Sequence, residues 1–176
     1  MTSLLWKHTG AIWPIGVSCS LTWLDLGAIA HIIQTAHIRT VLEVGVEHGG
    51  LASYLRSYGL YTGLVYRGID ITLNALDTRV RELDLIAIDQ RDAWDAATVR
   101  EMGLWLSTMP APALIICDGG DKPKELHLYA PLIRPGDVLL GHDFHNEYTD
   151  DAIADMPLTR MRADWLDDTM LCAFHA

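Results

Sequence analysis

The chain has 176 residues and a formal net charge of −10, and half of its residues are hydrophobic. This length is typical of one compact domain with a core of its own. Lys and Arg together number 13, against 23 Asp and Glu, so the long-range field repels phosphate polymers. We therefore expect a small-molecule ligand and no nucleic-acid partner.

We expect neither a membrane anchor nor a secretion signal in this sequence. Its longest stretch without a charged side chain, residues 8–24, is interrupted by glycine and proline and is too short to span a bilayer. The first ten residues lack the pattern of a signal peptide. The cysteines, Cys19, Cys117 and Cys172, include no CxxC pair, which favours reduced thiols. These features predict a cytoplasmic protein with no membrane partner.

The hydrophobic pattern alternates between strands and helices along the chain. After an irregular stretch over residues 1–22, helical spacing predicts a helix over 23–38. Nearly continuous apolar runs then predict buried strands, and amphipathic segments between them predict helices. The predicted strands span residues 40–45, 64–70, 84–89, 113–118, 137–141 and 170–174, and further helices are predicted at 49–59, 72–83, 96–108 and 123–130.

Strands that alternate with helices indicate an α/β fold. We expect a Rossmann-like, doubly wound and mostly parallel sheet with helices on both faces. No repeat, low-complexity tract or linker divides the sequence. The chain is therefore interpreted as a single domain over residues 1–176, with residues 1–22 as an irregular amino-terminal cap. Ligands of such sheets bind at the carboxyl ends of the strands.

Acidic residues end nearly every predicted strand. Since the carboxyl ends of parallel strands meet at one edge of a sheet, these side chains are expected to lie near one ligand. Each of them could instead cap the helix that follows, which is a common use of aspartate. The strand-end residues are Asp70, Asp89 with Asp92 close behind it, Asp118, and His142 followed by Asp143.

The first predicted strand runs into a turn, residues 45–50, with the sequence GVEHGG. A dinucleotide-binding turn has the pattern G-x-G-x-x-G, and Glu47 stands where its second glycine would approach a pyrophosphate. A glutamate there adds bulk and a negative charge. We therefore expect a ligand that contains adenosine, lacks phosphate and carries a positive centre. S-adenosylmethionine (SAM) has both a sulfonium and an ammonium group.

The motif E-V-G-x-x-x-G-G after a strand, followed by an acid that closes the next strand, resembles class I SAM-dependent methyltransferases. The resemblance covers residues 24–144. It implies that the glycine turn lies beneath the methionine part of SAM, that Asp70 binds the ribose hydroxyls and that Asp92 lies near the adenine amino group. Arg91 departs from the family pattern, which often has glycine there. The predicted cofactor-binding residues are Glu43, Gly45, Glu47, Gly49, Gly50, Asp70, Asp92 and Asp118.

The segment over residues 117–144 resembles small-molecule O-methyltransferases of the cephalosporin-hydroxylase, macrocin and catechol kind. This resemblance implies that Asp118 and Asp143 hold a Mg²⁺ ion. Two neighbours depart from the family, because Phe144 stands where the catechol type has Asn and His142 where the cephalosporin-hydroxylase type has Glu. A histidine ligand favours a softer divalent metal. The predicted metal ligands are Asp118, His142 and Asp143.

A hydroxyl group is a weak nucleophile at neutral pH, so methyl transfer to oxygen needs an activating group. A divalent metal lowers the pKa of a bound hydroxyl; without a metal, His142 is the alternative general base. Lys122 lies close to the place of a basic lysine in the catechol type and is a further candidate if burial lowers its pKa. The predicted catalytic residues are Asp118, Lys122, His142 and Asp143.

These features predict a SAM-dependent methyltransferase that acts on an oxygen of a small molecule or sugar. Two alternative functions stay open, and the sequence also leaves open whether the protein forms a homo-oligomer. A nicotinamide-dependent oxidoreductase shares the sheet and the ribose acid, but the sequence lacks a Tyr-x-x-x-Lys pair. A non-catalytic SAM-binding or interaction protein would keep only the cofactor site. Two tryptophans, Trp94 and Trp105, are expected to pack in or near the core.

Overall fold

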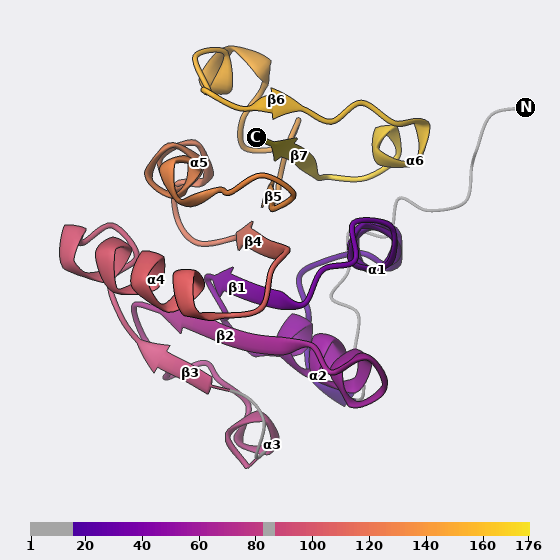
Figure 1. The fold of residues 1–176 in the computed structure, drawn as a ribbon. Coiled ribbons are helices and arrows are strands. Elements are labelled where there is room, and N and C mark those ends of the chain that lie inside the picture. Colours follow the sequence, from indigo (N-terminus) through magenta and orange to yellow (C-terminus); the bar gives the residue numbers. More distant parts are fainter. Residues whose placement is uncertain (1–15, 83–86) are drawn as a thin grey trace, which may run out of the picture.

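The computed structural model describes residues 16–82 and 87–176 of the chain. Their strands are β1 (Thr40–Val44), β2 (Val65–Asp70), β3 (Ala87–Gln90), β4 (Ala113–Cys117), β5 (Val138–Gly141), β6 (Thr159–Arg160) and β7 (Cys172–His175). They form one sheet in the order β3-β2-β1-β4-β5-β7-β6 (Figure 1). Strands β1 to β5 pair in parallel, and β7 runs antiparallel to both of its neighbours. The predicted Rossmann-like, mostly parallel sheet is confirmed.

Helices cover both faces of this sheet. They are α1 (Trp23–Thr35), α2 (Gly50–Thr62), α3 (Thr78–Arg81), α4 (Ala96–Thr108), α5 (Lys122–Tyr129) and α6 (Asp164–Asp167), with short 3-10 turns η2 (Ala130–Leu132) and η3 (Asp150–Ile153). Helices α1 and α2 lie on one face, and α4 and α5 lie on the other (Figure 1). Among the residues that the structure describes, no helix is long and apolar enough to cross a membrane.

Most predicted elements are found close to their expected bounds. The strands predicted over 40–45, 64–70, 113–118 and 137–141 each agree within one residue, and the helix predicted over 96–108 is α4. The strand predicted over 170–174 is found as β7, whereas the two-residue β6 was not predicted. The start of the strand predicted over 84–89 and the cap up to residue 15 lie outside the described residues.

Aspartate and threonine side chains fix where three helices begin. At the start of α1, the Thr22 side chain accepts from the Asp25 backbone and the Asp25 carboxylate accepts from the Thr22 backbone, which is a complete capping box. The Asp95 carboxylate accepts the backbone N–H of Thr98 in α4, and Asp121 caps α5 in the same way. These caps satisfy N–H groups that have no partner within the helix.

The predicted end of the second helix at Gly59 is wrong, because α2 continues through that residue to Thr62. The helix ends instead at Gly63, whose φ of 68° lies in the left-handed region. Its N–H donates to the carbonyl oxygen of Gly59, which is the usual way a glycine closes a helix. Two glycines at this spacing look alike in the sequence, and only the backbone conformation distinguishes them.

The helix predicted from Thr72 is also wrong. The Asp70 carboxylate accepts the backbone N–H of Thr72, and the Thr72 hydroxyl accepts that of Asn74, so this segment forms turns rather than a helix. A helix begins only after Asp77, whose carboxylate accepts from Arg79, and it is four residues long. Local side-chain hydrogen bonds thus replace the first turns of the expected helix.

Two hydrophobic layers enclose the sheet. Val41 and Leu42 are adjacent in β1 and point to opposite faces, as successive strand residues must. Val41 belongs to the layer that includes Ile29 of α1 and Leu55 of α2, whereas Leu42 belongs to the layer that includes Met102 of α4. Burial on both faces explains why the strands are apolar throughout rather than alternating.

The ladder continues for one residue beyond the carboxyl ends of the central strands. The N–H of Gly45 donates to Ile69 at 2.9 Å, that of Asp118 to Val44 at 2.8 Å, and that of His142 to Cys117 at 3.1 Å. The residues that follow β1, β4 and β5 are therefore held side by side at one edge of the sheet. The functional groups of this edge owe their spacing to backbone hydrogen bonds.

We predict opposite effects of one substitution at two helical glycines. In Gly50→Ala, the new Cβ would overlap the carbonyl oxygen of Ser18, which should lower the free energy of unfolding by about 1–3 kcal/mol. In Gly27→Ala, the new Cβ meets nothing within 4 Å, so the better helix propensity of alanine should raise the free energy of unfolding by about 0.5–1 kcal/mol. Urea denaturation followed by circular dichroism measures both; equal effects would contradict the close packing of residue 18 on α2.

Candidate functional site

A cavity of about 500 Å³ lies at the carboxyl edge of the sheet. It is formed by the glycine turn, by the loops that follow β2 to β5, and by residues 18–21 before α1. This volume is in the range of small-molecule binding sites. The predicted site residues that line the cavity are Glu43, Gly45, Glu47, Gly50, Asp70, Asp92, Asp118, Lys122, His142 and Asp143.

Gly49 is the one predicted cofactor residue that does not line this cavity. It has a φ of 85°, and a Cβ there would lie 2.9 Å from side-chain atoms of Leu76 and Val80. Gly45 has a φ of 88°, and a Cβ there would lie 2.5 Å from the backbone of Asp118. Both positions therefore favour glycine, since these φ values strain other residues and a Cβ would clash with backbone atoms at Gly45 and with side chains at Gly49.

The Asp70 carboxylate fixes the conformation of the glycine turn. Its Oδ2 accepts the backbone N–H groups of Val46 at 2.8 Å and Glu47 at 2.9 Å, and its Oδ1 accepts that of Thr72 at 3.0 Å. Asp70 therefore caps no helix, and it holds the turn after β2 together with the glycine turn. A carboxylate has about four acceptor positions, so one remains for a ligand hydroxyl. A role in ribose binding stays a prediction.

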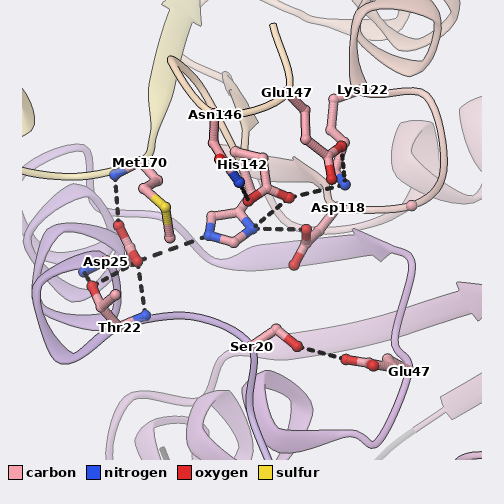
Figure 2. Close-up of polar contacts among 12 residues, drawn as sticks. Ser20, Thr22, Asp25, Glu47, Asp118, Lys122, His142, Asn146, Glu147 and Met170 are labelled. Carbon is pink, nitrogen blue, oxygen red and sulfur yellow. Dashed lines mark hydrogen bonds and ion pairs between the residues drawn. The ribbon is translucent and has the colours of Figure 1, made fainter. Parts of the chain in front are cut away.

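Glu47 is held in a conformation that costs energy for a residue other than glycine. Its φ is 48°, in the left-handed region. Its Oε2 accepts a hydrogen bond of 2.7 Å from the Ser20 hydroxyl, and its Oε1 lies 3.5 Å from His48 Nε2. The carboxylate predicted to exclude a pyrophosphate is thus held at the cavity by Ser20, a residue that no sequence pattern singled out (Figure 2).

The expectation that Trp94 packs in or near the core is wrong. Trp94 is 41% exposed and lines the cavity, with Nε1 3.3 Å from Glu125 Oε1 and Lys124 Nζ 3.8 Å from the ring centroid. The Asp92 carboxylate accepts the backbone N–H of Trp94 at 2.9 Å and thereby places the indole. Trp105, by contrast, does pack against the core layer of α4.

Glu125 is a buried carboxylic acid of the cavity that sequence reasoning did not select. It lies in the first turn of α5, and its Oε2 accepts the N–H of Gly119 at 3.0 Å. Burial raises the pKa of Glu125 to about 6, although the hydrogen bonds from Gly119 and Trp94 act against this. Its position in the sequence could have identified it, because it lies one helical turn after Asp121 in the helix that follows the fourth strand.

Asp118, His142 and Asp143 meet at one end of the cavity. His142 Nδ1 lies 2.9 Å from Asp118 Oδ1 and 3.5 Å from Asp143 Oδ2 (Figure 2). Asp143 has a φ of 58°, so its placement next to His142 requires a strained backbone. Burial raises the pKa of Asp118, with the hydrogen bond from His142 acting in the opposite direction. The structure thus brings together the residues that the sequence predicted here.

Asp25 is a partner of His142 that the sequence did not reveal. It is fully buried in α1, and its Oδ2 lies 3.8 Å from His142 Nε2, which is an ion-pair distance rather than a hydrogen bond. The same carboxylate accepts hydrogen bonds from Thr22 at 2.8 Å and from the backbone of Met170 at 3.0 Å (Figure 2). In the sequence Asp25 is indistinguishable from an ordinary acid in the first turn of a helix.

His142 carries a positive charge in this arrangement. Burial opposes the charged imidazole, but the carboxylates of Asp118 and Asp25 outweigh it and raise the pKa of His142 to about 10. Because both ring nitrogens of an imidazolium are protonated, neither can accept a proton from a hydroxyl group. This state does not fit the predicted alternative in which His142 acts directly as the general base.

The condition under which Lys122 was a candidate base, a pKa lowered by burial, is not met. Burial does act in that direction, but hydrogen bonds to Glu147 and Asp143 outweigh it and raise the pKa. Lys122 Nζ lies 2.8 Å from Glu147 Oε2 and 3.0 Å from Asp143 Oδ2 (Figure 2). Lys122 therefore keeps its proton at neutral pH, and it serves as a cation of the cavity rather than as a base.

The same cluster was predicted to hold a divalent metal. Ligand atoms of Asp118, His142 and Asp143 lie within 4.8 Å of one another, so distances alone are compatible with one ion. The charges are less favourable, because His142 and Lys122 already present cations to these carboxylates. A histidine also suits a softer metal than Mg²⁺. As its side chains stand, the cluster does not fit a hard divalent ion.

The fold is similar to those of several solved methyltransferase structures. A structure described as CmcI-N160 with SAH has a TM-score of 0.69 at 18% identity, covering 98% of this chain and 87% of that one. For CmcI-D160 with Mg and SAM, the TM-score is 0.65 at 19% identity, over 81% of this chain and 62% of that one. A candidate caffeoyl-CoA O-methyltransferase from Staphylococcus aureus has a TM-score of 0.62 at 12% identity, covering 87% of this chain and 83% of that one.

No protein-family model matches the sequence, and no curated protein matches it significantly. At identities of 12–19%, the structural likeness establishes the fold. The resemblance to class I SAM-dependent methyltransferases, on the small-molecule O-methyltransferase side, is therefore confirmed as a resemblance of architecture. Activity and substrate have to be argued from the site itself.

We predict that Asp25→Asn lowers the pKa of His142 from about 10 towards the ordinary value of about 6.5, because it removes one flanking carboxylate. A nuclear magnetic resonance titration of the imidazole measures this pKa. Asp155→Asn is the matched control, since Asp155 contacts His127 instead and should leave His142 unchanged. An unshifted His142 in Asp25→Asn would show that Asp25 does not hold the charge.

The raised pKa of His142 should also make the free energy of unfolding depend on pH. The folded-state pKa of His142 lies above its unfolded value, so the stabilisation is complete below about pH 6.5 and is lost as the pH rises towards about 10. Over this interval the wild type should lose more free energy of unfolding than Asp25→Asn does. Urea denaturation at each pH measures the difference, and parallel profiles would contradict the ion pairing.

Proposed function

We propose that this protein is a SAM-dependent methyltransferase that methylates an oxygen atom of a small molecule or sugar. The observation that carries the proposal is the charge of the cavity in a methyltransferase fold. Seven carboxyl groups line it against two cations, Lys122 and His142, so the cavity attracts a sulfonium and an ammonium group and repels a pyrophosphate. The carboxyl groups are those of Glu43, Glu47, Asp70, Asp92, Asp118, Glu125 and Asp143.

Glu43 supports a cationic ligand in particular. It is buried in β1 just before the last residue of the strand, it lines the cavity, and Tyr66 donates a hydrogen bond of 2.6 Å to its Oε2. Burial raises the pKa of Glu43 well above its ordinary value, despite that hydrogen bond. A buried carboxyl group of this kind is stabilised as a carboxylate when a cation binds beside it. The methionine part of SAM carries the positive charges that would do so.

The remaining predicted cofactor residues have roles that fit this ligand. Asp70 and the turn that it fixes would receive the ribose, and Asp92 with Trp94 would receive the adenine. The indole presents an apolar ring at the cavity, which suits a flat base. The cavity has room for the cofactor beside Asp118 and Asp143, which would then face the acceptor.

The transfer itself is an in-line displacement, in which an acceptor oxygen attacks the methyl carbon. Most of the rate enhancement of such a step comes from alignment of the two reactants. Asp118 and Asp143 would bind the acceptor hydroxyl, orient it and take up its proton, since both are acceptors at the end of the cavity. His142 stays a charged, positioning partner of Asp118 in this scheme.

Calorimetry with SAM, S-adenosylhomocysteine and NAD tests the ligand class. We expect SAM and S-adenosylhomocysteine to bind and NAD to show no heat, because Glu47 meets the pyrophosphate with a fixed negative charge. Glu47→Gly is the informative variant, since it removes that charge and the strained conformation together and should weaken the discrimination against NAD. Binding of NAD without SAM to the wild type would support the oxidoreductase alternative instead.

Asp143→Asn tests catalysis separately from cofactor binding. Turnover, measured as S-adenosylhomocysteine formed with a panel of hydroxylated small molecules, should fall about 10²–10⁴-fold, because the acceptor loses a proton acceptor. The affinity for SAM should change by less than roughly threefold, since Asp143 lies at the acceptor end. Asp151→Asn is the control, as this exposed residue lies outside the cavity. Undiminished turnover would remove Asp143 from the mechanism.

A non-catalytic SAM-binding protein is the second candidate. It predicts that SAM binds while no acceptor in the panel is methylated. The acidic cluster at the acceptor end argues for catalysis, because a pure binding protein has no need of Asp118 and Asp143 beside a charged His142.

A further inference from the structure

We propose that the ammonium group of Lys122 occupies the place of a divalent metal at the Asp118–Asp143 centre, so that the protein works with a built-in cation. The metal part of this proposal stands on geometry alone. The part that concerns the acceptor rests on the proposed function. Lys122 has three features that a surface lysine lacks, namely burial, two carboxylate partners and a position on the cavity wall.

The side chain of Lys122 is 7% exposed, although lysine is almost never buried without a partner. Its Nζ lies between two carboxylates, 3.0 Å from Asp143 Oδ2 and 2.8 Å from Glu147 Oε2 (Figure 2). Lys122 is also the first residue of α5, and the Asp121 cap fixes where that helix begins. Lys122 is thus fixed at both ends, its backbone by the start of α5 and its ammonium group by the two carboxylates.

The loop after β5 is shaped around this lysine. Asp143 is in the left-handed region, and its carbonyl oxygen accepts the N–H groups of Asn146 at 3.0 Å and Glu147 at 2.9 Å. This tight turn brings Glu147 back beside Asp143, so that both carboxylates face Lys122. A strained backbone of this kind persists where the surrounding contacts require it.

An ammonium and a divalent ion compete for the same carboxylate. A metal bound to Asp143 Oδ2 at an ordinary metal–oxygen distance of about 2.1 Å would lie within about 5 Å of Lys122 Nζ. Two like charges that close, in a partly buried cavity, repel each other strongly. On the other side, Asp118 Oδ1 is engaged by His142 at 2.9 Å. Each carboxylate thus already has a cationic partner, and an ion at this centre would have to compete with Lys122 for Asp143 and with His142 for Asp118.

The ammonium can do for an acceptor hydroxyl what a metal does elsewhere. It donates a hydrogen bond to the acceptor oxygen and stabilises the negative charge that develops there. The oxygen forms a bond to the methyl carbon, the carbon–sulfur bond breaks, and its electron pair stays on sulfur as neutral S-adenosylhomocysteine. The hydroxyl proton passes to the carboxylate of Asp118 or Asp143 and then to water. Lys122 keeps its own proton throughout.

Lys122→Met tests the proposal through a gain of metal binding. Removing the ammonium leaves Asp143 and Glu147 without their cation, so the variant should bind Mn²⁺ at least tenfold more tightly than the wild type does. Calorimetry with MnCl₂ and MgCl₂, with each protein free of added ligand, measures this directly. Lys124→Met is the matched control on the same helix, because its ammonium contacts Trp94 and not the carboxylates.

Two results would overturn the proposal. One is tight binding of Mg²⁺ or Mn²⁺ by the wild type that Asp143→Asn abolishes. The other is a folded Lys122→Met with no gain in affinity for either ion; if this variant does not fold, Lys122→Gln serves in its place, with circular dichroism as the check. SAM binding by the wild type is measured in the same series, so a failure of the proposed function is recognised separately from the metal result. Turnover of the wild type should also be unchanged by a chelator.

Discussion

The structure depends on a backbone constraint at one edge of the sheet. Parallel pairing of β1, β4 and β5 extends one residue past the strands, so Gly45, Asp118 and His142 are fixed as neighbours whatever their side chains. Several carboxyl groups are thereby forced into one partly buried cavity. Buried carboxylates are costly unless they are paired or neutralised. The remaining features of the site are ways of meeting that cost.

Three kinds of compensation are visible. Glu43 shifts its own protonation and accepts a hydrogen bond from Tyr66. The Asp70 carboxylate accepts hydrogen bonds from backbone N–H groups of the glycine turn, which stabilises the carboxylate and also fixes the conformation of the turn. Asp118 and Asp143 are paired with protein cations. The results differ: Glu43 remains an acid that responds to a nearby cation, Asp70 makes the glycine turn rigid, and Asp118 and Asp143 form a cluster of paired charges.

The sequence predicted what local patterns determine and failed where distant segments meet. Continuous apolar runs and strand-end acids were enough to predict the sheet and to bring Asp118 and Asp143 into one site. The partner of His142 was beyond reach, because Asp25 lies in α1 and is held by the backbone of Met170. The direction in which the pKa of Lys122 is shifted could not be decided from the sequence for a similar reason. Burial was foreseeable, but the position of Glu147 depends on a tight turn with a left-handed residue.

A similar fold at 18–19% identity implies that the strand ends occupy similar positions in the two proteins, but it does not determine which cation pairs with the carboxylates there. A related fold described with Mg and SAM therefore does not decide the matter for this chain. What decides it is whether a side chain already delivers positive charge to the same carboxylates, and Lys122 does so through contacts to Asp143 and Glu147. A fixed ammonium carries one charge where a metal carries two, but it needs no supply of ions. Under the proposal made for Lys122, the same edge of the sheet would allow methyl transfer with either kind of cation, and the residue at the start of α5 would select between them.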